Sequence, residues 1–271
     1  MVVASAAVCF LLILSLVLSH STTKLIHAVV QLDRGVIVLL NGFARRSWRF
    51  DVLISQVSHS AILQGVMVAL FWGAWFAPSD ASAGRRRRET MLASLIGLYA
   101  TVALAIAIRA ALPFRPRPVV ELANAFQVPY LGFDGTLHAS STSFPAGHAA
   151  VFCGLAVGLW SVSARLGLLS LLYALLIICL PRMYLGLHYP TDILAGAVLA
   201  IVTVPLVNEI LQMGSLVRRV LAWSEKHSAL FYGLLFLCSL DIAMEFSAVR
   251  PLVSFLGGAK KLVMLAIGVA V

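Results

Sequence analysis

The stretch from residue 143 to residue 192 begins and ends with side chains that can carry out acid–base and nucleophilic chemistry. It opens with the sequence Ser-Phe-Pro-Ala-Gly-His, which ends at His148, and its last eleven residues include Arg182, His188 and Asp192. The residues between are almost all apolar and numerous enough for two membrane-spanning helices. Two crossings return a chain to the side where it entered, so we expect these side chains to meet at one water–lipid boundary.

His188 and Asp192 lie four residues apart and straddle a predicted helix start, with Pro190 between them. Proline is favoured in the first turn of a helix, where its missing N–H costs nothing. Asp192 in that turn can accept a hydrogen bond from Nδ1 of His188, which leaves the Nε2 lone pair exposed as a nucleophile. A helix cap is the alternative role for Asp192, and the pair alone does not decide between the two.

Gly147 and His148 lie at the predicted start of another helix. A glycine lets backbone N–H groups approach an anion closely, and a helix N-terminus favours negative charge. His148 can therefore donate a proton to a leaving oxygen while backbone amides hold phosphoryl oxygens. For a single interfacial histidine, hydrogen bonding to water is the alternative.

Three arginines near these residues suit an anionic substrate. Arg182 lies six residues before His188, and Arg115 and Arg117 precede the loop that leads to His148. Guanidinium groups offer paired donors at a fixed geometry, which matches a phosphate group. The alternative is that these side chains extend into the lipid headgroup region, as interfacial arginines commonly do.

The composition indicates the environment of this chemistry. Hydrophobic residues make up 61% and charged residues 11% of the 271 residues, whereas soluble domains average about 45–50% apolar and about 25% charged. The apolar runs are continuous, which predicts an all-α integral membrane protein. The net charge of +9 is accounted for by basic loops and anionic lipid, so we expect no nucleic-acid partner. The four cysteines all lie in apolar runs without metal-ligand spacing.

The chain is predicted to have three regions. Residues 1–59 would form a signal-anchor span and an interfacial amphipathic helix, residues 60–210 a catalytic core, and residues 211–271 a basic cytoplasmic segment with an extra membrane helix or tail. The amphipathic helix is predicted at residues 25–50, and the pattern leaves open whether residues 252–271 cross the membrane. The predicted spans are residues 2–19, 61–77, 91–112, 149–164, 166–181, 193–210 and 229–248.

Basic residues set the predicted orientation. The consecutive arginines Arg85–Arg88 occupy a predicted short loop, and positive charge recurs at Arg218, Arg219 and Lys226. Lysine and arginine collect in cytoplasmic loops, so both segments are predicted to be cytoplasmic. Counting spans from them places the histidines and the other site candidates on the non-cytoplasmic face.

Together these residues resemble the signature motifs of the type 2 phosphatidic acid phosphatase (PAP2) superfamily, which also contains the vanadium haloperoxidases. The segments that carry the resemblance are Pro145-Ala146-Gly147-His148, Arg182-x5-His188-x3-Asp192 and a preceding Arg-Pro motif. The resemblance implies a six-helix transmembrane core, here followed by an additional C-terminal apolar helix. It also implies a phosphohistidine intermediate formed without a metal ion or cofactor.

The same resemblance implies a role for each residue. It makes His188 the nucleophile, His148 the general acid and Asp192 the partner of His188. It makes Arg117 and Arg182 ligands of the substrate phosphate.

The first motif departs from the family pattern, which has a lysine and six residues before Arg-Pro. Counting back from Arg117 leads to Ala110, and counting back from Arg115 leads to Ile108. Arg109 is adjacent to both positions, so it is expected to substitute for the lysine. Arg115 is kept as a further candidate phosphate ligand.

The other two motifs differ by single residues. Ala146 replaces the usual serine of the second motif but keeps its backbone N–H, which with that of Gly147 is expected to bind phosphate. Pro181 replaces the serine that normally begins the third motif. Neither replacement removes a group that moves protons or electrons, so activity is expected.

We therefore expect a membrane lipid phosphatase that hydrolyses a lipid phosphate or diphosphate, such as phosphatidate, phosphatidylglycerol phosphate, undecaprenyl diphosphate or lipid A. A lipid phosphotransferase could use the same site, and a haloperoxidase would require bound vanadate. A transporter or channel could instead use Asp241 and Glu245, four residues apart in one apolar run. Short loops favour a bacterial inner membrane with the site facing the periplasm. The sequence does not indicate an oligomeric state.

Overall fold

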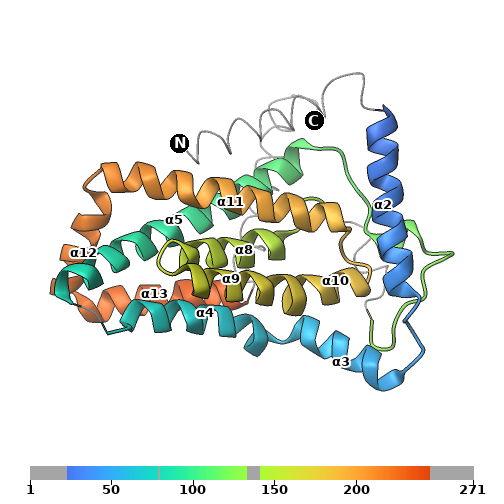
Figure 1. Cartoon of the computed structure of the whole chain (residues 1–271), viewed down its shortest axis with the longest axis horizontal. Coiled ribbons are helices and arrows are strands. Elements are labelled where there is room, and N and C mark those ends of the chain that lie inside the picture. The colour runs from blue at the N-terminus through green and yellow to red at the C-terminus, as the bar shows by residue number, and fades with distance from the viewer. Residues whose placement is uncertain (1–22, 79, 133–140, 245–271) are drawn as a thin grey trace, which may run out of the picture. The chain divides into compact units, whose positions relative to one another are not determined.

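The computed structural model describes residues 23–78, 80–132 and 141–244, and the regular elements within these residues are all helices (Figure 1). The prediction of an all-α protein is therefore confirmed. The chain divides into two compact units, residues 1–221 and residues 222–271. The helices are α2 (Thr23–Asn41), α3 (Trp48–His59), α4 (Ala61–Phe76), α5 (Ala81–Ala111), α6 (Pro118–Glu121), α8 (Gly147–Trp160), α9 (Ala164–Tyr173), the π-helical η2 (Ala174–Cys179), α10 (Leu180–Tyr184), α11 (Pro190–Met213), α12 (Leu216–Lys226) and α13 (Ser228–Ala243).

Several of these helices are apolar enough to indicate a membrane protein. In the part of the chain that the structure describes, three are long enough to cross a bilayer: α5, the continuous helix Ala164–Tyr184, and α11. The pair α3 and α4, bent by 46°, adds a fourth candidate. α8 and α13 are apolar but have only 14 and 16 residues, and at 1.5 Å per residue α8 covers roughly 21 Å. The described residues therefore contain three or four candidate membrane spans. They do not confirm the expected core of six transmembrane helices.

Small residues let the central helices of the first unit pack closely. α8 lies against both α5 and α11 (Figure 1), and 11 of its 14 residues are buried. A Cβ added at Gly97 of α5 would lie 3.0 Å from the Cα of Val204 in α11. One added at Gly154 of α8 would lie 2.6 Å from a methyl carbon of Leu98. Glycine at these positions permits the close backbone approach that is common between membrane helices.

The four consecutive arginines lie in a helix, which corrects the prediction of a loop. α5 begins at Ala81 and includes Arg85–Arg88. Arginine has a good helix propensity, and Arg85 pairs with Glu89 one turn later at 3.5 Å, so the charged run extends the helix. At 1.5 Å per residue, Arg85 and Arg109 are roughly 36 Å apart along α5. This separation exceeds the thickness of a hydrocarbon core, which is about 30 Å.

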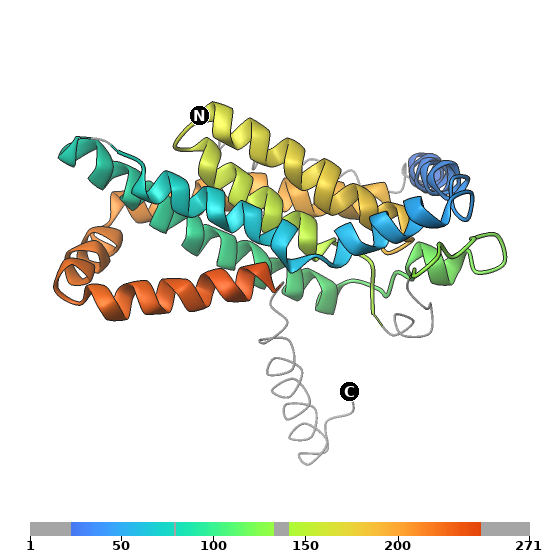
Figure 2. The same cartoon turned by 90° about the horizontal axis from the view of Figure 1, so that it is seen from below.

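The region predicted as one amphipathic helix is divided in two. α2 ends at Asn41, and α3 begins at Trp48 after a turn in which Arg45 has a φ of 61°. Within the first unit, α2 runs across the end of the long helices instead of along them, as the dark blue helix in Figures 1 and 2 shows. This crossing direction brings α2 against the segments that carry the candidate site, and its interfacial location stays a prediction.

Some predicted segments lie outside the described residues. These are the span at residues 2–19, the tail at residues 252–271 and Glu245 of the proposed carboxylate pair. In the second unit, α13 matches the start of the predicted seventh apolar run and contains Asp241. The domain boundaries and the transporter alternative therefore stay predictions.

Candidate active site

The two candidate histidines lie together at one end of the first unit's helices. His148 is the second residue of α8, and His188 lies in the turn between α10 and α11. Both side chains are buried, and their ring centroids are 6.4 Å apart. The two helical segments between them thus bring the chain back to its starting point, as their spacing predicted.

The turn before His188 depends on a glycine in the left-handed region. Gly186 has a φ of +71°, and an added Cβ would lie 2.6 Å from the ring of Phe126. Its carbonyl accepts a hydrogen bond from the N–H of Val119 at 2.9 Å, and Leu187 donates to the carbonyl of Arg182 at 2.9 Å. A residue with a side chain would be strained here, so Gly186 fixes the direction in which His188 enters the site.

Ser143, rather than Asp192, is the hydrogen-bond partner of His188. Nδ1 of His188 lies 2.9 Å from the backbone oxygen of Ser143 and 3.9 Å from Oδ2 of Asp192. A carbonyl oxygen can only accept, so Nδ1 carries the proton and Nε2 keeps its lone pair. The expected direct bond to Asp192 is therefore replaced by a bond to the main chain, while the expected tautomer is retained.

Positive charge acts on His188 from several sides. Burial lowers the pKa of His188 well below its usual value, and Arg117, His148, Arg182 and Arg109 lower it further through their charges. The imidazole is consequently neutral at neutral pH, which is the form required of a nucleophile. The same cations would attract an anionic group to the neighbourhood of Nε2.

Asp192 caps α11 and also connects it to α8. Its Oδ2 accepts a hydrogen bond from the N–H of Tyr189 at 2.7 Å as part of a capping box. Its backbone oxygen accepts from the N–H of Ala146 at 2.9 Å. The cap role is thus confirmed, and the Ala146 N–H that was expected to bind phosphate is donated to Asp192 instead. A Cβ added at Gly196 of α11 would lie 2.4 Å from the Ala146 carbonyl, so this glycine allows the close approach.

Arg109 and Arg117 are the two first-motif arginines that act on His188. Arg109, in the last turn of α5, donates to the carbonyl of Pro145 through Nε at 3.1 Å and through Nη2 at 2.5 Å. Arg117 is the N-cap residue of α6, and among the surrounding charges it lowers the pKa of His188 most. The structure therefore places Arg109 against the second motif, and the charges of both arginines act on His188. Their role as phosphate ligands stays a prediction.

Arg182 is buried and tied to the bend between α3 and α4. Its Nη2 donates to the backbone oxygen of Ser58 at 3.1 Å, near the end of α3. The last carbonyls of a helix have no partner within the helix and carry partial negative charge. The contact therefore satisfies one of them and holds the guanidinium close enough to lower the pKa of His188.

Arg115 has different partners from those expected of a phosphate ligand. Its Nη1 donates to Oδ1 of Asp192 at 2.6 Å, and its Nη2 donates to Oδ2 of Asp33 at 2.6 Å. The guanidinium also lies over the ring of Tyr189, 4.5 Å from its centroid. With two carboxylates bound, Arg115 serves the structure around His188 rather than an incoming anion.

Asp33 is the residue of this region that sequence reasoning missed. It lies within residues 25–50, the segment predicted as an amphipathic helix, yet its side chain is completely buried. A carboxylate among apolar helix positions is itself a signal, because such a group is rarely buried without a partner. The sequence does not say that the partner is Arg115.

Gly147 gives a direct test of how the site holds Arg109. A Cβ at Gly147 would lie 3.0 Å from Nη2 of Arg109, so the Gly147→Ala variant should displace that guanidinium. If Arg109 helps to bind the phosphate, losing about 1 kcal/mol of its interaction raises KM roughly fivefold. Steady-state kinetics would check this. Gly73→Ala is the control because a Cβ there has no atom within 4 Å, and an unchanged KM in Gly147→Ala would contradict the role of Arg109.

Continuous apolar helices and a buried centre of histidine and arginine side chains define a helical membrane protein with a site suited to an anionic group. The PAP2 superfamily model matches residues 91–214, a range that contains both histidines and all the arginines of the site. This match suggests an activity of the phosphatase or phosphotransferase type. Comparison with curated proteins and with solved structures found no match.

Proposed function

We propose that this protein is a membrane phosphatase that hydrolyses a lipid phosphate or diphosphate through a phosphohistidine intermediate. The observation that carries the proposal is the pair of buried histidines, 6.4 Å apart, next to arginines whose charges act on His188. A neutral imidazole among cationic groups suits attack on an anionic phosphorus centre. The match of residues 91–214 to the PAP2 superfamily supports the same class of reaction.

The first step transfers the phosphoryl group to the protein. Nε2 of His188 attacks phosphorus, so a P–N bond forms and the P–O bond to the lipid breaks. His148 gives its proton to the departing oxygen. As Nε2 becomes bonded, positive charge develops on the imidazole, and the hydrogen bond from Nδ1 to the Ser143 carbonyl stabilises it.

The second step releases phosphate. Water attacks phosphorus while His148 accepts its proton, and the electron pair of the P–N bond returns to Nε2 of His188. Arg109, Arg117 and Arg182 would hold the phosphoryl oxygens in both steps, where charge develops in the transition state. After the first step His148 has lost its proton and can accept one from water. After the second step it is protonated again, as the next cycle requires.

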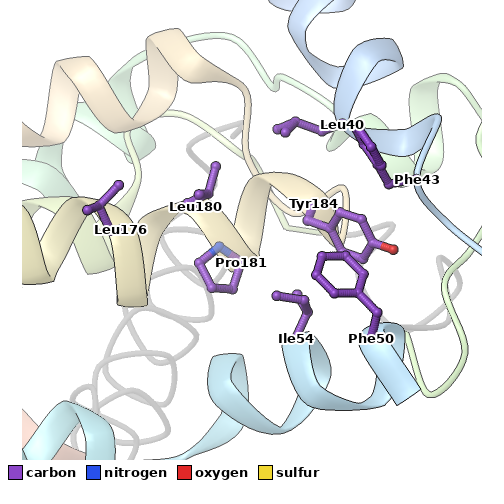
Figure 3. Close-up of a pocket in the computed structure, with 8 residues that line it drawn as sticks. All are labelled: Leu40, Phe43, Phe50, Ile54, Leu176, Leu180, Pro181 and Tyr184. Atoms are coloured by element: carbon purple, nitrogen blue, oxygen red, sulfur yellow. The ribbon is translucent and has the colours of Figure 1, made fainter. Parts of the chain in front are cut away.

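A lipid substrate is favoured by an apolar pocket that is lined in part by α10, the helix of Arg182 (Figure 3). The pocket has a volume of about 270 Å³ and is lined by residues of α2, α3, η2 and α10 and of the turn after α2. Two of its lining residues, Pro181 and Tyr184, flank Arg182 in the sequence. A lipid chain in this pocket would therefore lie against the same helix that carries a candidate phosphate ligand.

Filling the pocket should discriminate between substrates by chain length. Leu180 lines the pocket and is partly exposed, so Leu180→Trp should exclude part of a long chain. Loss of contact with two methylene groups, at about 0.8 kcal/mol each, would raise KM roughly tenfold for a long-chain lipid phosphate. A short-chain analogue should be unaffected. Leu172→Trp, on the same helix but outside the pocket, is the control, and equal KM changes for both substrates would contradict the pocket's role.

The site is proposed to face the non-cytoplasmic side. The arginine run Arg85–Arg88 and the site residue Arg109 are at opposite ends of α5, which has 31 residues. Positive charge marks the cytoplasmic side, so the opposite end of the helix would face outward, which is the periplasm if the membrane is a bacterial inner membrane. Labelling of single cysteines introduced at Arg86 and at Leu131 with a membrane-impermeant reagent would test this orientation.

The proposal is tested by incubating detergent-purified protein in EDTA with a panel of lipid phosphates and diphosphates and measuring phosphate release. Release from at least one lipid, with none from soluble glycerol phosphate, supports a lipid phosphatase. Absence of release from every lipid would overturn it. If labelled phosphoryl groups instead appear on a second lipid without free phosphate, the protein is a phosphotransferase using the same residues.

A further inference from the structure

We propose that Asp33, which lies outside the PAP2-matched residues, is a positioning residue of the active site and acts through Arg115. The inference rests on the proposed function, because it concerns the same reaction. Asp33 lies in the middle of α2 and is fully buried, whereas its neighbours Leu32 and Gly35 are exposed. Asp33 is the only acidic residue of α2, and it lies on the side of the helix that faces the site.

One guanidinium connects Asp33 to the active-site carboxylate. Arg115 donates to Oδ2 of Asp33 and to Oδ1 of Asp192, each at 2.6 Å. Both carboxylates are fully buried, and the arginine side chain is only 27% exposed. Charge-assisted bonds from a planar fork define direction as well as distance, so Asp33 determines where Arg115 holds Asp192.

Asp33 also caps the helix on which Asp192 lies. Its Oδ1 accepts from the N–H of Thr191 at 3.0 Å, and its Oδ2 accepts from the Thr191 hydroxyl. The first N–H groups of a helix have no partner within the helix, and a negative charge is favoured at that end. α2 therefore supplies a partner for the N–H of Thr191, in addition to the capping box that Tyr189 and Asp192 form at the start of α11.

Asp192 links these contacts to backbone N–H groups close to both histidines. The backbone oxygen of Asp192 holds the N–H of Ala146, two residues before His148. Oδ2 of Asp192 holds the N–H of Tyr189, which directly follows His188. A change at Asp33 should therefore alter the alignment of the reacting groups and lower kcat. The effect on KM should be small, because the partners of Asp33 are Arg115 and Thr191 and not the proposed phosphate ligands.

The experiment is a double-mutant cycle of Asp33→Asn and Arg115→Lys, with kcat, KM and thermal unfolding measured in detergent. Lysine keeps the charge but cannot bridge two carboxylates as a guanidinium does. Asp33→Asn should lower kcat by about 10- to 100-fold, the range typical of residues that orient a functional group. In the Arg115→Lys background the same change should have much less effect, because coupled residues are not additive. Full additivity would overturn the proposal.

Asn41→Ala separates positioning from simple anchoring of α2. Asn41 exchanges two hydrogen bonds with the backbone of Gln127, at 2.7 and 2.8 Å, and does not contact Arg115. A loss of kcat equal to that of Asp33→Asn at the same loss of Tm would show that Asp33 only anchors the helix. If wild-type protein releases phosphate from no lipid, the proposed function fails, and the unfolding cycle still decides whether Asp33 and Arg115 are coupled.

Discussion

Replacing His188 with asparagine is expected to abolish phosphate release from every lipid substrate, lowering kcat by on the order of 10⁴-fold or more, as when a nucleophile is removed. The asparagine amide can still donate to the Ser143 carbonyl that His188 Nδ1 approaches at 2.9 Å, but it offers no nitrogen lone pair to attack phosphorus. In wild-type protein, brief exposure to a lipid with labelled phosphate followed by denaturation in alkali should leave label on the chain. The variant should carry none.

A histidine outside the site provides the matched control for this change. His27 lies on α2 and is exposed, so His27→Asn should keep both the turnover and the covalent label. If His188→Asn retained the label, another residue would be the nucleophile and the proposed chemistry would have to be reassigned. If turnover were lost while the label accumulated, His188 would act in the second step instead of the first.

Replacing Arg115 with methionine is expected to be the most destabilising change in the site. The guanidinium separates the fully buried carboxylates of Asp33 and Asp192, and contacts each of them at 2.6 Å. Removing one member of a buried ion pair typically costs about 3–5 kcal/mol because the remaining charge is left uncompensated. The free energy of unfolding, measured by denaturant titration in mixed micelles, should therefore fall by an amount in that range.

Two further variants test whether the buried carboxylates of Asp33 and Asp192 cause the loss of stability in Arg115→Met. In the Arg115→Met/Asp33→Asn double variant only Asp192 is left without a cation, so it should recover part of the lost stability. Arg34, on the same helix as Asp33, forms a more exposed ion pair with Glu121 of α6, so Arg34→Gln should lower stability much less. Equal stability losses for Arg115→Met and Arg34→Gln would show that burial of the two carboxylates has no energetic consequence.

The positions of the helices were largely predictable because continuous apolar runs are a strong local signal. The predicted span at residues 193–210 lies within α11, and that at residues 166–181 lies within the helix Ala164–Tyr184. The ends differ because caps and prolines decide them: Pro190 begins α11 after the capping box at Tyr189. The arginine run was predicted as a loop because its charge indicates topology but does not oppose helix formation.

The candidate site was predictable only where side-chain identity carries the information. His148 and His188 stand at helix starts that the spacing revealed, and the structure brings them together. The partner of His188 was not predictable, because a backbone carbonyl at Ser143 has no signature in the sequence. Asp33 was missed because it meets Thr191 across a sequence separation of 158 residues, and only the packing of α2 across the bundle creates that contact.

That separation has a consequence for how the protein is made. A ribosome adds roughly 5–20 residues per second, so Asp33 is synthesised roughly 8 to 32 s before Thr191, the residue it caps. During this interval its carboxylate has no helix terminus to bind and must stay hydrated. Docking of α2 can be completed only after the start of α11 has emerged and been inserted. The candidate active site can thus be completed only after Thr191 has been synthesised, although its supporting residue Asp33 is made 158 residues earlier.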